Sequence, residues 1–180
     1  EEAGEVLRNA VWLSGATGGF CALLLLLVRN HLTVIGQPEE VVREGSDYIL
    51  LVALSLVPIL LSQSVKQFSE ALSRPWKPML IYTGGVLLNI LLNWVLIYGH
   101  WGAPAMGVTG AGWATLIART AVLGGVVVLL LVDDTLKEWS PHRWLTPVSI
   151  VQMKRLTPFA APVGLLHFLG VGAFAFAALL

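Results

Sequence analysis

The chain has 180 residues, an apolar composition and balanced charge. Hydrophobic residues make up 56% of it and charged residues only 12%, against roughly 45–50% and 25% in ordinary soluble domains. The 11 basic and 11 acidic residues give a net charge of zero, which argues against nucleic acid as a partner. We therefore expect a membrane protein whose partners are membrane lipid and small molecules.

Long apolar segments recur along the whole chain. Crossing a bilayer takes roughly 20 mostly apolar residues in a helix that rises about 1.5 Å per residue. This criterion predicts an all-α, polytopic transmembrane helix bundle of about five spans. In chain order the spans cover residues 9–28, 48–65, 79–98, 108–132 and 156–180. No initiator Met precedes them and no polar flank follows them, so we interpret the chain as an internal piece of a longer protein.

The connections between these spans differ in basic charge. Eight Lys and Arg residues fall on one side of the predicted membrane and two on the other. Because cytoplasmic loops carry the excess of basic residues, loops 66–77 and 133–155 are predicted to be cytoplasmic and loops 29–47 and 99–107 external. We expect a multi-pass protein of the inner cell membrane. Loop 133–155 is also longer than the 2 to 8 residues usual in bundles, which indicates a linker between two helical bodies.

Two amides stand one helical turn apart in the third span. Asn89 and Asn93 are spaced i, i+4 and so share one helix face. In lipid such side chains bond a partner helix or line a wet cavity. Their carbonyl oxygens could bind a cation or orient a substrate, whereas the simpler alternative is that they hold two helices together.

Three other polar residues in the spans are candidates for function. Arg119 is the only charged residue inside any predicted span, and inserting it costs at least about 2.5 kcal/mol. It either serves a function or snorkels toward the external interface. Thr115 either bonds its own helix backbone or points toward the asparagines. His167, in the fifth span, could relay protons or simply pack. The histidines are too scattered to predict a metal site.

The run from Ser73 to Thr115 combines several of these features in one order. They are Arg74 and Pro75, then Asn-x-x-x-Asn, then Tyr98 and Gly99, then the glycine-rich segment from Gly102 to Gly107, and finally Gly112 to Thr115. This combination resembles the fifth-helix region of the multidrug and toxic compound extrusion transporters. Pro162 to Gly164 and Gly172 to Ala175 look like helix seven of that family.

The resemblance implies a place for the chain in a two-lobe, twelve-helix transporter. The spans would be helices three to seven. Residues 1–132 would form part of the amino-terminal transmembrane lobe, 133–155 the cytoplasmic inter-lobe linker and 156–180 the start of the carboxy-terminal lobe. The family's members export amphipathic, often cationic compounds by antiport with protons or sodium. The coupling ion is then the only expected cofactor, and we expect the full-length protein to be monomeric.

The resemblance also implies roles for individual residues. Asn89, Asn93 and Thr115 match positions that line the amino-lobe cation site, which in the family also needs an acidic residue on helix one. In one branch helix seven carries a Glu where this chain has Gly170, and another branch has Asp in place of Asn93. The complete set of coupling residues of either branch is therefore not expected in this chain.

Two other functions are weighed against a drug exporter. A flippase or exporter of lipid-linked oligosaccharide or polysaccharide would favour a cavity rich in Arg and Lys for pyrophosphate, and only Arg119 qualifies. A membrane enzyme would need clustered nucleophiles or metal ligands at an interface, and the sequence offers none. We therefore predict a secondary active transporter and not an enzyme.

Overall fold

The computed structural model describes residues 2–30, 39–141 and 144, and this part of the chain is helical. Residues up to 142 form one compact unit and the remainder a second, and the fold described here is that of the first unit. Its elements in chain order are α1 (Glu2–Asn30), α2 (Glu39–Ala71), α3 (Trp76–Tyr98), the 3-10 turn η1 (His100–Gly102), α4 (Gly107–Val132) and α5 (Asp134–Trp139).

Four helices of the described part are long and apolar enough to cross a membrane. Their candidate spans are Ala3–Leu27, Gly45–Ala71, Trp76–Tyr98 and Gly107–Val132. The first four predicted spans are thereby confirmed. The predicted bounds were too narrow for the first two, because the helices continue through polar residues that a hydropathy criterion excludes. The fifth predicted span, 156–180, lies outside the described residues.

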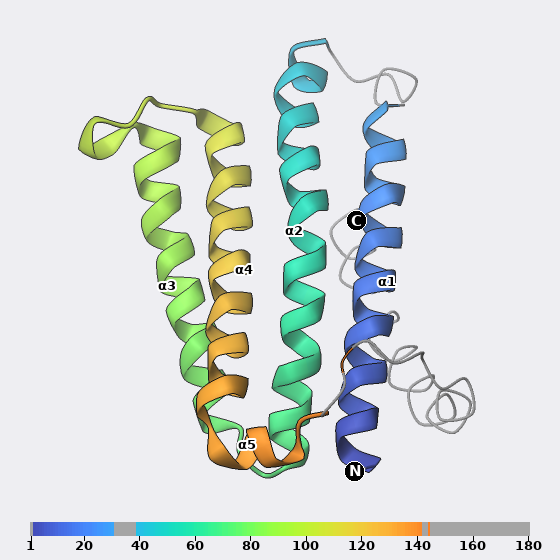
Figure 1. Ribbon diagram of the computed structural model, residues 1–180. Helices are drawn as coiled ribbons and strands as arrows, with labels where there is room; N and C mark the ends of the chain where they lie inside the picture. The colour runs from blue at the N-terminus through green and yellow to red at the C-terminus, as the bar shows by residue number, and fades with distance from the viewer. Residues whose placement is uncertain (1, 31–38, 142–143, 145–180) are drawn as a thin grey trace, which may run out of the picture. The chain divides into compact units, whose positions relative to one another are not determined.

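The helices are not neighbours in chain order. Packing contacts join α2 to both α1 and α4, and α4 to α3, whereas α2 and α3 barely touch. The spatial order is therefore α1, α2, α4, α3 (Figure 1). In this order α2 and α4 run in the same direction, whereas α1 runs opposite to α2 and α3 runs opposite to α4. As a result α4 lies between the two helices that precede it in the chain.

One apolar core lies at the end of the bundle where α2 ends and α3 begins, which we call the hinge end. Buried side chains from α1, α2, α4 and α5 meet there and exclude water from their contact surfaces. These are Leu7, Val65, Phe68, Val126, Leu130 and Leu136. Leu136 belongs to α5, so the first residues of the segment 133–155 pack against this bundle. Its role as an inter-lobe linker stays a prediction.

Polar contacts at the hinge end connect α3 to the junction of α4 and α5. The Nζ atom of Lys77 donates a hydrogen bond to Oδ2 of Asp133, a side chain that is only 6% exposed. The other oxygen, Oδ1, accepts from the backbone N–H of Leu136 at 3.0 Å and so caps α5. The Lys77 ammonium holds the pKa of the Asp133 carboxyl below its usual value, with the help of that backbone bond. The carboxylate therefore holds three elements together.

Glycines allow α3 and α4 to approach closely. A Cβ atom on Gly85 would lie 2.2 Å from Cγ2 of Val122, and one on Gly110 would lie 2.6 Å from the carbonyl oxygen of Leu96. Side chains at these positions would force the helices apart. At the far end of α3, Gly99 adopts φ +76° as the C-cap, a conformation that favours glycine. Gly85 and Gly110 thus serve close helix packing, and Gly99 serves the turn that follows α3.

Candidate functional site

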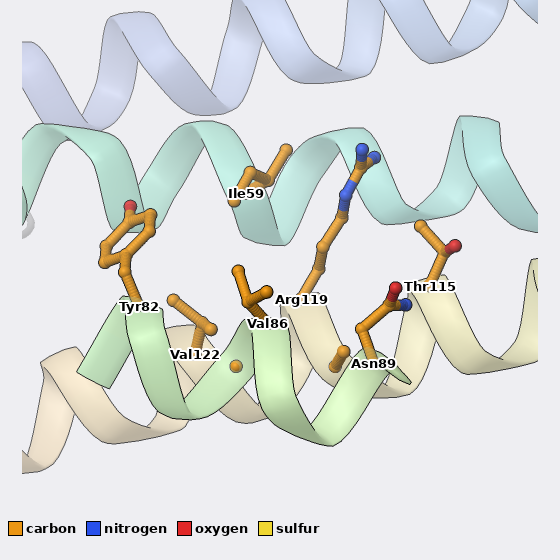
Figure 2. Close-up of a pocket in the computed structure, with 9 residues that line it drawn as sticks. Ile59, Tyr82, Val86, Asn89, Thr115, Arg119 and Val122 are labelled. Atoms are coloured by element: carbon orange, nitrogen blue, oxygen red, sulfur yellow. The ribbon is translucent and has the colours of Figure 1, made fainter. Parts of the chain in front are cut away.

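A cavity of about 280 Å³ lies at the junction of α2, α3 and α4. It exists because α2 and α3 both pack on α4 while leaving a gap between each other. Its lining is mixed, with apolar residues between four polar side chains. The lining residues are Ile59, Tyr82, Gly85, Val86, Asn89, Thr115, Ala118, Arg119 and Val122 (Figure 2). Three of the sequence-predicted site residues, Asn89, Thr115 and Arg119, therefore share one cavity. No acidic residue of the described part of the chain lines it.

Arg119 crosses this cavity. Its side chain extends from α4 toward α2 (Figure 2), where Nη1 donates a hydrogen bond of 2.7 Å to Oγ of Ser55. Ser55 is fully buried. Arg119 also lies at the midpoint of α4, roughly 18 Å from either helix end at about 1.5 Å per residue. That distance exceeds the reach of an arginine side chain. In the described bundle the guanidinium instead bonds the neighbouring helix α2, and its functional role stays a prediction.

The two asparagines bond each other. Nδ2 of Asn93 donates to Oδ1 of Asn89 at 3.0 Å, and Asn89 lines the cavity. Oδ1 of Asn93 is buried and has no hydrogen-bond partner among the described residues. Buried acceptors of this kind are rare because leaving one unpaired costs free energy. The pair therefore does not join α3 to a described neighbour, and it leaves one carbonyl oxygen available to a donor or a cation.

Thr115 satisfies both of the alternatives that its sequence left open. Its hydroxyl donates to the backbone carbonyl of Ala111 at 2.9 Å, and the same side chain lines the cavity beside Asn89. Since a hydroxyl has one hydrogen and two lone pairs, the oxygen can still accept a bond or coordinate a cation. Thr115 and Asn89 thus present oxygen atoms from two helices to one space.

Sequence reasoning missed two groups that position this site. Tyr82 lines the cavity, where its hydroxyl donates to Oε1 of Gln63 at 3.1 Å and lies 2.9 Å from Oγ of Ser62. The second group is a row of fully buried serines on α2, Ser55, Ser62 and Ser69. Ser55 and Ser62 contact the cavity residues Arg119 and Tyr82, whereas Ser69 donates to the carbonyl of Arg74 at the hinge end. Their seven-residue spacing keeps them on one helix face, and small polar residues favour helix contacts in membranes. That periodicity was the signal available in the sequence.

The remaining sequence-predicted site residue, His167, lies outside the described residues. Its part in proton relay stays a prediction. Gly170 likewise lies outside the described part of the chain.

Comparison with known proteins places the chain among membrane transport proteins. The MatE family model matches residues 1–95, a segment that includes both asparagines. The chain is 29% identical over 179 residues to the probable multidrug resistance protein NorM of Pseudomonas putida, covering 99% of the chain and 39% of that relative. It is 34% identical over 113 residues to the multidrug resistance protein PmpM of Pseudomonas aeruginosa, covering 62% of the chain and 24% of that relative. The chain spans about two fifths of the length of the relatives that it matches along its whole extent.

Proposed function

The chain belongs to the MatE family, and on that premise we propose that the full-length protein is a secondary active transporter. It exports drugs or toxic organic compounds, often cationic, by antiport with protons or sodium ions. Two observations support this: several relatives are named multidrug resistance proteins, and a cavity with four polar side chains in a mixed lining lies between apolar candidate spans. Membership in a family of transporters also decides against the membrane enzyme.

The observation that carries the antiport proposal is the unpartnered Oδ1 of Asn93. A hard cation such as sodium binds oxygen ligands, and an amide carbonyl is one of them. Oδ1 of Asn89 accepts one hydrogen bond and keeps a second lone pair, as the Thr115 hydroxyl does. Asn89 and Thr115 line the cavity and Asn93 bonds Asn89 from one helical turn away, so these three neutral oxygens would form one wall of a cation site. The resemblance to the family expects an acidic residue on helix one to complete it.

Transport of lipid-linked oligosaccharide or polysaccharide is the alternative function. A pyrophosphate carries at least two negative charges, which favours several cationic side chains around it. The cavity presents one cation, Arg119, among its lining residues. Export of small amphipathic molecules is therefore the function that the cavity supports better.

Everted membrane vesicles that contain the full-length protein test the proposal. We expect a fluorescent cationic dye to be transported when a proton or sodium gradient is imposed, and Asn89→Ala and Asn93→Ala to lose ion coupling. Absence of gradient-dependent transport for a panel of cationic dyes would refute the transporter. Unchanged coupling in both alanine variants would show that the asparagines serve helix packing and not ion binding.

A matched pair of threonines sharpens this test. Thr115 and Thr120 lie on the same helix and each donates to the carbonyl four residues earlier, at 2.9 and 2.7 Å. Only Thr115 lines the cavity, whereas Thr120 is exposed. Substitution by valine removes the same backbone bond from both. We therefore expect Thr115→Val to impair coupling and Thr120→Val to leave it unchanged, and equal effects would contradict the proposed site.

We also propose the membrane orientation that the basic residues predict, with loops 66–77 and 133–155 cytoplasmic. The bond between Lys77 and Asp133 supports the placement of both loops on one side, because it brings these two segments to the same end of the bundle. The excess of basic residues assigns that side to the cytoplasm. Labelling of Ser73→Cys and Ala103→Cys with a membrane-impermeant maleimide, in a Cys21→Ser background, tests the assignment. We expect Ser73→Cys to react in everted vesicles only and Ala103→Cys in intact spheroplasts only.

A further inference from the structure

The guanidinium of Arg119 has more hydrogen-bonding capacity than its neighbours use. It carries five N–H donors, and its hydrogen bond in the described bundle is the one to Ser55. No described Asp or Glu forms a salt bridge with it. In the middle of an apolar span a cation without a counter-ion is costly. An anion from outside this bundle would relieve that cost.

The position of Arg119 determines where such an anion would bind. The bond to Ser55 fixes one edge of the guanidinium against α2, because Ser55 is fully buried. The side chain also lines the cavity shared with Asn89 and Thr115. The cavity therefore has a cationic side chain across one part of its wall and neutral oxygens across another, so it can distinguish the two ends of a zwitterion.

We propose that Arg119 is a carboxylate-recognising residue and that the cavity accepts amphipathic compounds carrying a single carboxylate. A guanidinium matches the planar carboxylate by parallel N–H···O bonds, and one positive charge neutralises one such group. Phosphate and pyrophosphate fit less well because they bring more negative charge than this cavity balances. In naming a transported substrate, this inference rests on the proposed function.

Rhodamine B and its ethyl ester provide the test. Both carry the same delocalised xanthene cation, and they differ in whether the carboxylate is free. Binding of each dye to the purified full-length protein is measured by fluorescence anisotropy for the wild type, Arg119→Gln and Arg119→Lys. The glutamine variant removes the charge and keeps a shorter, neutral amide, and the lysine variant keeps the charge without the planar fork.

We expect Arg119→Gln to weaken rhodamine B binding about tenfold, the effect of losing one charge-assisted hydrogen bond, and to leave ester binding within about twofold. The affinity of Arg119→Lys for rhodamine B should lie between those of the wild type and Arg119→Gln. Equal loss of both dyes in both variants, or no change in either, would overturn the proposal, as would a wild type that does not prefer the free acid.

Transport of the same dyes in everted vesicles separates this inference from the proposed function. Carboxylate-selective binding that depends on Arg119, without gradient-driven transport of either dye or of the panel of cationic dyes, would refute the transporter and support the recognition site. Gradient-driven transport of the ester with no dependence of either dye on Arg119 would support the transporter and overturn the recognition site.

Discussion

Gly85 provides the sharpest test of how α3 and α4 pack. Its substitution by alanine would place a Cβ atom 2.2 Å from Cγ2 of Val122, so the two atoms must separate by roughly 1.2 Å to reach ordinary van der Waals contact. Val122 cannot easily turn away, because it is only 6% exposed and a helical valine strongly prefers one χ1 rotamer. The helices must therefore move apart.

Gly84, the preceding residue of α3, is the matched control. A Cβ atom there would meet no atom within 4 Å. Alanine at either position gains about 0.5–1 kcal/mol of helix stability over glycine, and this gain cancels in the comparison. The remaining difference is the overpacking energy, typically about 1–3 kcal/mol. We expect Gly84→Ala to be slightly more stable than the wild type and Gly85→Ala to be less stable by about 1–2 kcal/mol.

Thermal unfolding of the full-length protein in detergent, followed by tryptophan fluorescence, measures this order. The double variant Gly85→Ala/Val122→Ala removes the clashing methyl group, so it should recover much of the stability lost in Gly85→Ala and show strong non-additivity. If Gly85→Ala is as stable as Gly84→Ala, or if the double variant shows simple additivity, the close contact between the helices is refuted.

Three further predictions concern helix packing and the hinge end. Asp133→Ala should lower the free energy of unfolding by about 1–2 kcal/mol in chemical unfolding. Asp133→Asn should lower it by about half as much, because Asn retains the cap of α5 and because the ion pair that it loses is with Lys77, which is 54% exposed. The pKa of Asp133 is lowered in the folded protein, so its contribution to stability is present above the usual carboxyl pKa and is lost as the pH falls through the folded-state pKa. Thermal unfolding should therefore show a loss of stability in acid for the wild type and a smaller loss for Asp133→Asn. Gly110→Ala should lower the unfolding temperature more than Gly124→Ala, because its Cβ would meet the backbone oxygen of Leu96 whereas that of Gly124 meets nothing within 4 Å; equal shifts would contradict the packing.

The sequence was sufficient for the membrane spans because hydropathy is a local property. Twenty apolar residues satisfy their backbone polar groups within one helix, whatever lies beside them, so the four described spans were predicted close to their observed positions. The helix ends were predicted less well. α1 and α2 extend through polar residues because packing at the hinge end shields side chains such as Arg8, which is 8% exposed.

At the site, too, the sequence predicted local features and the tertiary structure decided the contacts. The spacing of Asn89 and Asn93 predicted a shared face, but a spacing of i, i+4 does not say whether the two amides bond each other or another helix. They bond each other, and Oδ1 of Asn93 has no partner among the described residues. The family resemblance selected Asn89 and Thr115, and the structure brings them to one cavity.

Composition, span lengths and motif order thus determined, from the sequence alone, a polytopic helical protein of a transporter family. Only the tertiary structure decided that α4 lies between α2 and α3 and that Arg119 bonds Ser55, 64 residues away in the chain. The physical reason is that hydropathy acts along one helix, whereas the helix order depends on which small residues let two backbones meet, as Gly85 and Gly110 do. The cavity follows from that helix order, and so does the position of Arg119 within it.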